Sequence, residues 1–403
     1  MTMRPFTSTI SIDEAHAIIE AGVSAIDRAE RVPLAEARGR VLADDVVAAF
    51  DVPPFDRASM DGYAVRAADT AGATREQSRG LRLAGRVYTG EVPTEPVTAG
   101  ACLEIATGAP MPLGADAVIM VEDTAPGDPG VQVFAAVRPG QNIGRRGADI
   151  SSGDTVLRGG EVLNASRIGA LAALGFADVD VWARPRVAIL STGNEIAAQG
   201  RPLAPGQIYD INRYTLSTVV EEHGGLPVPV STARDTMEAL GHAVDACLGH
   251  DLIVFSGGSS VGERDLILDI IRQRGEVRFH GIAVKPGKPT LFGTLGGRPV
   301  FGMPGYPTSC LSNAYILLVP ALRRMARLPP SAPRRVTMSL AARVASVAGR
   351  HQFYSVRIED GQAMPAFKAS GDITSMSRAD GYIEIATDVT IDEAGTPVVV
   401  TFF

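Results

Sequence analysis

The arrangement of hydrophobic and polar positions changes along this chain, and each arrangement predicts a different kind of structure. Near the N-terminus the apolar positions follow a helical spacing, at Ile12, Ala15, Ile18, Ile19, Val23 and Ile26. Ser11 precedes this run and Glu14 lies three residues later, a spacing typical of a capping box. The pattern therefore predicts a helix that begins directly after Ser11.

The next region contains short apolar runs of β type, separated by glycine and proline. Such runs occupy residues 101–106, 117–121 and 131–137. We expect a β-rich domain at about residues 51–139, inserted into a discontinuous helical and linker domain made of residues 1–50 and 140–183. Together these segments form an N-terminal region, residues 1–183, of mixed α+β type.

From residue 184 onward, apolar runs of strand length alternate with segments of helical spacing. We expect strands at 187–190, 226–230, 251–255, 277–284 and 299–302. This alternation predicts an α/β domain at 184–328 with a mostly parallel sheet. After a proline-rich linker, residues 334–403 alternate with period two and predict a small C-terminal β-barrel. The fold class is therefore multidomain α/β.

Composition and charge exclude several classes of protein. The chain has 403 residues and a net charge of −7, so it has no general positive field for nucleic acid or an anionic membrane. The three cysteines lie far apart, which argues against a disulfide framework or a zinc site. No apolar run approaches the roughly 18 residues of a membrane helix, and no signal peptide is evident. We expect a cytoplasmic protein.

One glycine-rich stretch follows the expected strand at 251–255 and precedes a helical spacing that begins at Leu266. Glycine permits close approach of a ligand, and a helix N-terminus offers unpaired N–H groups to an anion. A tight turn that binds nothing has the same local pattern. The candidate binding residues in this stretch are Ser256, Gly257, Gly258, Ser260 and Gly262.

Four other glycine-rich or charged loops follow expected strands of the same sheet, at 191–195, 234–235, 285–289 and 303–308. In open α/β sheets, ligands bind at the carboxyl ends of the strands. Lys285 and Lys288 suit a phosphate, and each carboxylate alone suits a helix cap. The three carboxylates together favour Mg²⁺ between acid groups and ligand phosphates, with Glu195, Asp235 and Asp265 as metal ligands. These loops predict a Mg²⁺-assisted site for a phosphorylated or nucleotide-containing ligand.

Two loops of the N-terminal region also concentrate polar side chains. Residues 53–65 contain Asp61 and read either as a polar turn or as a site loop. Residues 140–150 contain Arg145, Arg146 and Asp149. An arginine pair in a glycine-rich loop suits an oxyanion, although solvated surface arginines are common.

Taken in order, these motifs resemble the molybdopterin molybdenumtransferase family, of MoeA type, and also the C-terminal domain of gephyrin. The matching segments are FDRASMDGYAVRA, TGAPMPLGADAVIMVEDT, GQNIGRRGADI, STGNE, SGGSSVGERD, KPGKP, GMPGYPTS and SGDITSMSRADGY. The resemblance implies a homodimer of four-domain subunits. It implies insertion of molybdate into adenylylated molybdopterin, with Mg²⁺-dependent release of AMP. Partners would include other proteins of molybdenum cofactor biosynthesis and molybdoenzymes.

The resemblance also implies roles for individual residues. The catalytic positions would be Asp61, Glu195, Asp235, Asp265, Thr107 and Asp149. Lys285, the glycine-rich stretch at 257–262, Lys288, Pro304 and Gly305 would bind the pterin nucleotide. Arg145 and Arg146 would be candidates for binding molybdate.

The chain departs from the family pattern at Gly144, Ser259, Gly281 and Tyr306. These departures leave a second function open, a non-catalytic paralogue that binds or delivers the molybdenum cofactor for a specific molybdoenzyme. A scaffold role and a nucleotide-dependent phosphohydrolase are further alternatives. The sequence does not distinguish molybdate from tungstate.

Overall fold

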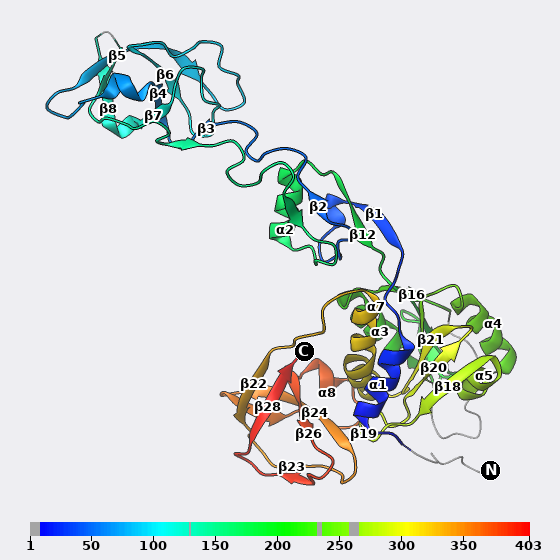
Figure 1. Ribbon diagram of the computed structural model, residues 1–403. Coiled ribbons are helices and arrows are strands. Elements are labelled where there is room, and N and C mark those ends of the chain that lie inside the picture. Colours follow the sequence, from blue (N-terminus) through cyan, green and yellow to red (C-terminus); the bar gives the residue numbers. More distant parts are fainter. Residues whose placement is uncertain (1–8, 129, 232–235, 258–265) are drawn as a thin grey trace, which may run out of the picture. The chain divides into compact units, whose positions relative to one another are not determined.

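The computed structural model describes residues 9–128, 130–231, 236–257 and 266–403. The chain divides into two compact units (Figure 1). The first comprises residues 1–30, 39–41 and 181–403, and the second comprises residues 31–38 and 42–180. Each unit is described separately below.

Helix α1 (Ile12–Gly22) opens the first unit and confirms the predicted capping box. The Ser11 hydroxyl accepts a hydrogen bond from the Glu14 backbone N–H at 3.2 Å. The Ser11 backbone N–H in turn donates to the Glu14 carboxylate at 2.8 Å. Ala15 and Ile19 then enter the hydrophobic core of the α/β domain, so the N-terminal helix is part of that domain's packing.

The α/β domain is built on a six-stranded sheet. Its strand order is β16 (Leu226–Pro229), β13 (Arg186–Ser191), β17 (Leu252–Ser256), β21 (Arg298–Met303), β20 (Leu291–Leu295) and β18 (Gly275–His280). The first four strands are parallel, and β20 is antiparallel to both β21 and β18. The mostly parallel sheet is therefore confirmed.

One expected strand of this sheet was wrong in its extent. The apolar run at 277–284 predicts a single strand, but β18 ends at His280. Val284 belongs instead to β19 (Val284–Lys285), which pairs with a strand of the C-terminal domain. Period alone does not reveal that a chain leaves one sheet and joins another.

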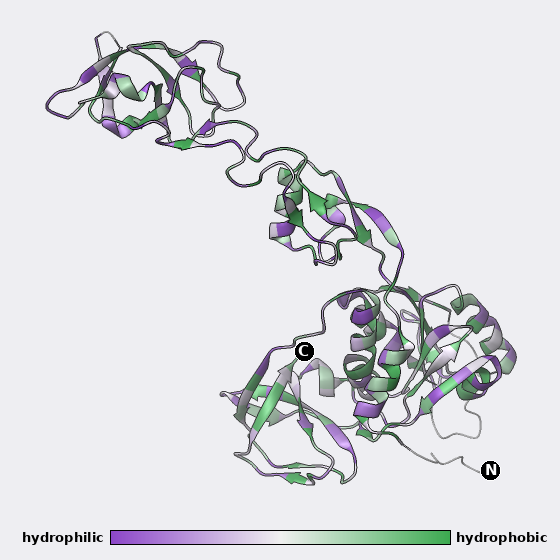
Figure 2. Cartoon of the chain, viewed as in Figure 1, coloured by the Kyte–Doolittle hydropathy of each residue, from purple (hydrophilic) through white to green (hydrophobic). Residues whose placement is uncertain are grey.

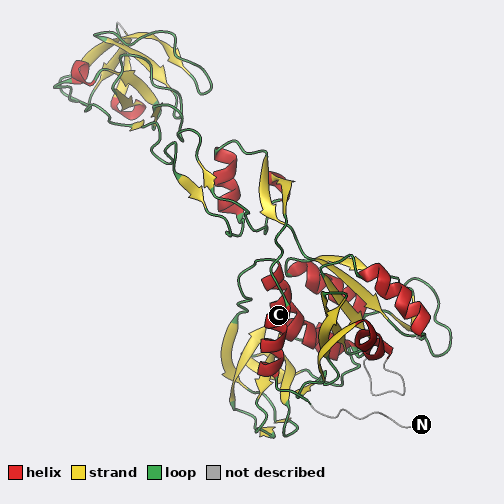
Figure 3. Cartoon of the chain, turned by 45° about the vertical axis from the view of Figure 1, so that its right-hand side comes forward, coloured by secondary structure: helices red, strands yellow, loops and turns green. Residues whose placement is uncertain are grey.

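Helices cover both faces of the sheet (Figures 1 and 3). One face packs against α1, α3 (Asn212–Glu222), α6 (Pro307–Asn313), the π-helical turn η4 (Ala314–Leu318) and α7 (Val319–Met325). The other face packs against α4 (Met237–Cys247) and α5 (Leu266–Arg274). Because both faces are covered, the strands β13, β17 and β21 are largely buried and mostly apolar (Figure 2).

A proline explains the π-helical turn before α7. Pro320 has no backbone N–H, so it cannot make the usual helical hydrogen bond to the turn before it. The chain widens to a π-helix at that turn and continues as α7.

The C-terminal domain is a β domain, with the period-two burial that the sequence predicts. Its sheet runs in the order β19, β24 (His351–Glu359), β26 (Gly381–Ile385), β28 (Pro397–Phe402) and β22 (Arg335–Ser339). Strand β25 (Gln362–Pro365) also pairs with β24. The remaining elements are β23 (Val344–Ala345), β27 (Ile391–Asp392) and the short helix α8 (Thr374–Ser377).

The second unit contains another six-stranded sheet. Its order is β7 (Ala117–Met120), β4 (Gly62–Val65), β6 (Ala101–Ile105), β5 (Arg79–Val87), β9 (Gly130–Val133) and β8 (Thr124–Gly127). Alternate residues of its strands enter two separate cores, one on each face.

The smaller elements of the chain are short strand pairs, one nine-residue helix and three 3-10 turns. The strand pairs are β1 (Ala29–Pro33) with β12 (Asp178–Trp182), β2 (Val46–Val47) with β11 (Thr155–Leu157), β3 (Arg57–Ala58) with β10 (Ile143–Gly144), and β14 (Ile196–Ala197) with β15 (Ile208–Tyr209). The helical pieces are α2 (Ala165–Ala173), η1 (Leu34–Glu36), η2 (Ala67–Thr70) and η3 (Val121–Asp123). Within the described parts of the chain, no helix has both the length and the apolar character needed to cross a membrane.

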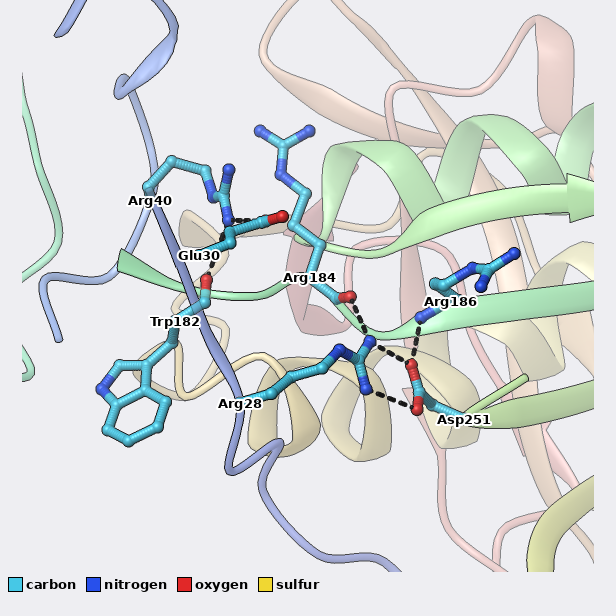
Figure 4. Close-up of polar contacts among 7 residues, drawn as sticks. All are labelled: Arg28, Glu30, Arg40, Trp182, Arg184, Arg186 and Asp251. Carbon is cyan, nitrogen blue, oxygen red and sulfur yellow. Dashed lines mark hydrogen bonds and ion pairs between the residues drawn. The ribbon is translucent and has the colours of Figure 1, made fainter. Parts of the chain in front are cut away.

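The first unit is discontinuous in sequence, and one carboxylate joins the segments that enter and leave it (Figure 4). The two oxygens of Asp251 accept hydrogen bonds from the Arg28 guanidinium at 2.8 and 2.6 Å. Asp251 also accepts the Arg186 backbone N–H at 2.7 Å. Arg28 donates further to the Arg184 carbonyl, so the outgoing and returning segments meet at this point.

The ionisation of Asp251 reflects these bonds. Its side chain is 11% exposed, and burial alone would raise its pKa. The hydrogen bonds from Arg28 and Arg186 outweigh burial and hold the pKa of Asp251 below its ordinary value. A carboxyl with a lowered pKa contributes stability above its ordinary pKa of about 4 and loses that contribution as the pH falls.

We predict that Arg28→Ala lowers the stability of the first unit by about 1–2 kcal/mol at neutral pH, because Asp251 loses its charged partner. The effect is limited because the Arg28 side chain is itself half-exposed. Thermal unfolding checks this prediction, with Arg278→Ala as control because its partner Glu276 and Arg278 are both exposed. The difference from wild type should shrink below about pH 4. Equal effects of the two substitutions would contradict the role of Arg28.

Candidate functional site

Three parallel strands bring their following loops to one edge of the α/β sheet. Ser191 at the end of β13 pairs in register with Ser256, and Ser256 with Met303. The loops after these residues therefore begin side by side. A Cβ atom on Gly305 would lie only 3.5 Å from the Gly257 Cα, so the backbones of two of these loops are in contact.

Gly257 meets a strict conformational demand at this edge. Its φ is +93°, in the region that favours glycine. An added Cβ atom would also lie 2.6 Å from the Thr192 carbonyl oxygen. Gly257, which the sequence analysis named as a candidate binding residue, is thus required at this position by the close approach of two loops.

The same edge holds a cluster of buried polar atoms that lack hydrogen-bond partners among the described residues. They are Ser191 Oγ, Thr192 Oγ1, Asp210 Oδ2, Asn212 Oδ1 and Asn313 Oδ1. Buried polar atoms in folded proteins are nearly always hydrogen-bonded, because an unpaired one costs about 1–3 kcal/mol. Five such atoms around one sheet edge make this edge a candidate site for a polar ligand.

Asp210 and Asn212 are candidate site residues that the sequence analysis did not name. Asp210 is 5% exposed, and its Oδ1 accepts the Arg213 backbone N–H at 3.0 Å. Asn212 donates to the Gly305 carbonyl at 2.8 Å and thereby fixes the loop after β21. The only local signal was polar side chains at the start of α3, which ordinary helix capping also explains.

The lysine-containing loop also lies at this edge. Strand β18 runs in the same direction as β21, because both are antiparallel to β20. The loop between β18 and β20, which carries Lys285 and Lys288, therefore starts and ends at the carboxyl edge. Asn313 holds this loop by donating to the Gly287 carbonyl at 2.8 Å and to Thr290 Oγ1 at 2.5 Å.

The predicted metal ligands are only partly within the described residues. Glu195 is exposed, and its carboxylate lies close to Gly193: a Cβ atom added to Gly193 would be 2.7 Å from Glu195 Oε1. Asp235 and Asp265 lie outside the described residues, as do Gly258, Ser259, Ser260 and Gly262. Among the residues that the structure does describe, no group of three or more His, Cys, Asp or Glu side chains suits a metal ion. Glu195 and the unpartnered Asp210 oxygen are nevertheless the hard donors that Mg²⁺ prefers, so the donor chemistry fits.

In the second unit, the structure brings the predicted residues Asp61 and Thr107 together. The Thr107 backbone N–H donates to Asp61 Oδ1 at 2.7 Å. This N–H, followed by the Thr107 side chain, lowers the pKa of Asp61, so the carboxylate stays charged near neutral pH. Asp61 is exposed and lies after β3 in the chain. Thr107 is the second residue after the end of β6.

Arg145 and Arg146 bind carboxylates of their own unit, which the sequence analysis did not foresee. Arg145 contacts Asp56 at 2.6 Å, and Arg146 contacts Asp51 at 2.5 Å. The Arg146 backbone N–H is the main cause that lowers the pKa of Asp56. An oxyanion at this loop would compete with these carboxylates. Asp149 is exposed on the same loop, and Gly144 pairs with Arg57.

Comparison with known proteins covers nearly the whole chain. Residues 10–175 match the MoeA N-terminal region (domain I and II), residues 188–324 a probable molybdopterin binding domain, and residues 337–403 the MoeA C-terminal region (domain IV). Molybdopterin molybdenumtransferase 2 of Mycobacterium tuberculosis is 38% identical, over 91% of this chain and 93% of that protein. Molybdopterin molybdenumtransferase of Haemophilus influenzae is 33% identical, over 95% and 98% respectively.

Solved structures show the same fold. A molybdopterin biosynthesis MoeA protein from Pyrococcus horikoshii superposes with a TM-score of 0.84 at 39% identity, covering 98% of this chain and 99% of that one. A second MoeA protein from the same organism gives a TM-score of 0.79 at 33% identity, covering 98% and 100%.

We predict that Gly257→Ala destabilises the first unit by about 1–3 kcal/mol, because alanine meets both the positive φ and the Thr192 carbonyl. Gly241→Ala is the matched control, since Gly241 lies in α4 with nothing within 4 Å of an added Cβ. The control should gain up to about 1 kcal/mol from helix propensity. Thermal unfolding measures both variants, and a neutral Gly257→Ala would contradict the close approach.

Proposed function

This chain belongs to the molybdopterin molybdenumtransferase family, of MoeA type, and from this we propose that it inserts molybdate into adenylylated molybdopterin and releases AMP, in molybdenum cofactor biosynthesis. The observation that carries the proposal is the cluster of unpartnered buried polar atoms at the sheet edge. These atoms lie in the segment that matches a probable molybdopterin binding domain. A ligand rich in phosphate and pterin heteroatoms would supply the missing hydrogen bonds.

Under this proposal, the residues at the sheet edge form two groups with different roles. Lys285 and Lys288 attract the phosphates, and Asn313 holds their loop in place. Ser191, Thr192, Asp210 and Asn212 orient the ligand through their unpartnered polar atoms. Pre-oriented donors and acceptors of this kind lower the cost of reaching a charged transition state.

Mg²⁺ would be held by Glu195 together with Asp235 and Asp265, and Asp210 adds a fourth carboxylate close to the same strand ends. When bound, the ion would neutralise phosphate charge and polarise the bond that breaks on AMP release. Ser256, Gly257, Gly258, Ser260 and Gly262, with Pro304 and Gly305, would form the walls of the phosphate site.

The second unit contributes Asp61, Thr107, Asp149, Arg145 and Arg146 under the same proposal. The lowered pKa of Asp61 keeps it charged and thus able to accept hydrogen bonds from a ligand. By family resemblance these residues would serve a site completed in a cytoplasmic homodimer. Arg145 and Arg146 would attract molybdate only in exchange for their contacts with Asp56 and Asp51.

We predict that Glu195→Gln lowers AMP release by at least about 100-fold while leaving the thermal midpoint unchanged, because Glu195 is exposed and serves the ligand. Asp265→Ala should behave in the same way. The assay combines adenylylated molybdopterin, Mg²⁺ and either molybdate or tungstate, and Glu238→Gln in the first turn of α4 is the control.

Two outcomes of this assay have separate meanings. Unchanged turnover in Glu195→Gln would remove that residue from the site but keep the function. A wild-type protein that binds the pterin nucleotide without releasing AMP would replace the proposed function with that of a carrier.

Tyr306 is a departure from the family pattern whose surroundings the structure describes. Its side chain is 68% exposed, and one ring edge lies 3.7 Å from a Cβ atom built on Gly371. The preceding residue, Gly305, is fixed by Asn212. Tyr306 therefore offers an exposed ring next to the loop that Asn212 holds, where it can stack on a planar heterocycle.

We predict that Tyr306→Asn raises KM for the pterin nucleotide by about 5- to 50-fold with little change in kcat, because it removes a stacking contact. Tyr306→Phe retains the ring and should stay within about two-fold of wild type. Steady-state kinetics with both variants checks this. An equal rise of KM in both would show that the hydroxyl, rather than the ring, contacts the ligand.

A further inference from the structure

Two buried side chains, those of Asn313 and Thr290, hold the turn between the two lysines of the loop at 281–290. Both are 0% exposed. Asn313 Nδ2 donates to the Gly287 carbonyl at 2.8 Å and to Thr290 Oγ1 at 2.5 Å. The Thr290 hydroxyl in turn donates to the Gly287 carbonyl at 2.9 Å. These three hydrogen bonds close a triangle around Gly287, which we call the glycine clamp.

The acceptors around Asn313 determine which way its amide faces. A backbone carbonyl can only accept a hydrogen bond, so the nitrogen of Asn313 must face Gly287. The oxygen, Asn313 Oδ1, is then left without a hydrogen-bond partner among the described residues. The clamp therefore depends on the donor half of one amide.

Packing alone does not explain an asparagine at this position. A buried acceptor without a partner destabilises the fold, because it has lost its hydration without gaining a hydrogen bond. Neighbouring residues of α6 and η4, namely Cys310, Ala314 and Leu317, belong to the hydrophobic core. An apolar side chain would suit these surroundings better. The bonds that the amide makes to the loop account for its presence.

Gly287 permits the close approach that the clamp requires. A Cβ atom added to Gly287 would lie 2.3 Å from Asn313 Nδ2, and the φ of Gly287 is +100°. Gly287 is buried, whereas Lys285 and Lys288 on either side of it are half-buried. The clamp thus acts on buried main chain that lies between two partly accessible cations.

The two lysines are held in different ways. Lys285 belongs to β19, whose pairing with β24 places it beside Gln352. Lys288 belongs to no strand and follows the clamped turn. Its carbonyl accepts the Thr290 N–H at 2.9 Å and the Ile282 N–H at 3.0 Å. The clamp therefore acts on Lys288 more directly than on Lys285, since Thr290 belongs to both sets of bonds.

From these observations we propose that Asn313 and Thr290 are positioning residues, which set the spacing of the two cations by fixing Lys288 relative to Lys285. Neither residue touches a ligand, since both are fully buried. The inference rests on the proposed function in one respect, namely that the lysines bind phosphate groups of a nucleotide. Two cations at a fixed spacing bind a pyrophosphate group with less loss of conformational freedom than two mobile ones.

Hydrogen exchange of the full chain tests the positioning without any ligand. Thr290→Val keeps the shape of the side chain and removes two of the three hydrogen bonds of the clamp. Exchange of the amides at 281–290 should become at least about ten-fold faster, while exchange in β17 stays unchanged. Thr290→Ser retains the hydroxyl and should stay within about three-fold of wild type.

Binding of ADP in the presence of Mg²⁺ tests the effect on the lysines, because ADP contains a pyrophosphate group. Thr290→Val should raise the Kd for ADP by about five- to twenty-fold. The same change made in a Lys288→Ala protein should alter Kd by less than about two-fold, whereas in a Lys285→Ala protein it should keep its effect.

Steady-state kinetics separates positioning from a loss of folded protein. In Thr290→Val, KM for the pterin nucleotide should rise while kcat changes little, because the lysines bind the ground state and the transition state alike. A purely structural role would lower the folded fraction, and thus kcat, without a rise in KM.

A change from asparagine to aspartate tests the donor half of the amide. Asn313→Asp replaces the donor nitrogen with an oxygen and should weaken ADP binding more than Thr290→Val does. Asn164→Asp in the second unit is the matched control, because Asn164 uses its oxygen to accept the Arg167 N–H at 3.0 Å, and an aspartate retains that bond. Thermal midpoints show which variants fold. If Asn313→Asp fails to fold, the two Thr290 variants still decide the question.

Two results would overturn the inference. One is unchanged hydrogen exchange at 281–290 in Thr290→Val, and the other is an undiminished effect of Thr290→Val in the Lys288→Ala protein. A wild-type protein that binds ADP but releases no AMP would contradict the proposed function and leave the inference standing. A wild-type protein that does not bind ADP would overturn both.

Discussion

The contact between Arg28 and Asp251 is the constraint on which the first unit depends. The chain leaves this unit after residue 30 and returns to it for good at residue 181, with more than a hundred residues of the second unit between. Asp251 binds the outgoing segment through the Arg28 side chain and the returning segment through the Arg186 backbone. Because Asp251 directly precedes β17 and Arg186 begins β13, the same carboxylate also links the two central strands at their amino ends, in the register that the ladder between them has.

That register connects stability at one end of the sheet with binding at the other. At the amino ends of β13 and β17, polar groups are paired through Asp251. At the carboxyl ends, Ser191 and Thr192 keep unpartnered hydroxyls. A shift of one residue between these strands would turn their side chains to the opposite face and scatter the polar cluster. Contacts such as those of Asp251 hold the strands at their amino ends. The strands can therefore carry hydroxyls without hydrogen-bond partners at their carboxyl ends, where a ligand is expected.

The sequence predicts much of this architecture, and the misses have a common physical cause. The capping box of α1, the parallel strands and the glycine at 257 follow from local period and turn chemistry, and the structure contains them. The sheet change at β19, the pairing of Arg145 with Asp56, and the burial of Asp210 depend on residues distant in sequence. No local pattern encodes such contacts. The roles of Asp235 and Asp265 remain predictions, since these residues lie outside the described part of the chain.

Strand β19 has a consequence for how separable the domains are. Lys285 belongs to the loop at the ligand edge of the α/β domain, yet its backbone forms the edge strand of the C-terminal sheet beside Gln352. The two domains therefore share a piece of main chain rather than only a surface. A gene fragment encoding the α/β domain alone would remove the neighbour of this strand, so the lysine loop would keep the contacts with Asn313 but lose its pairing with β24. Shuffling the C-terminal domain between relatives would, for the same reason, alter the lysine loop of the α/β domain along with the domain that was exchanged.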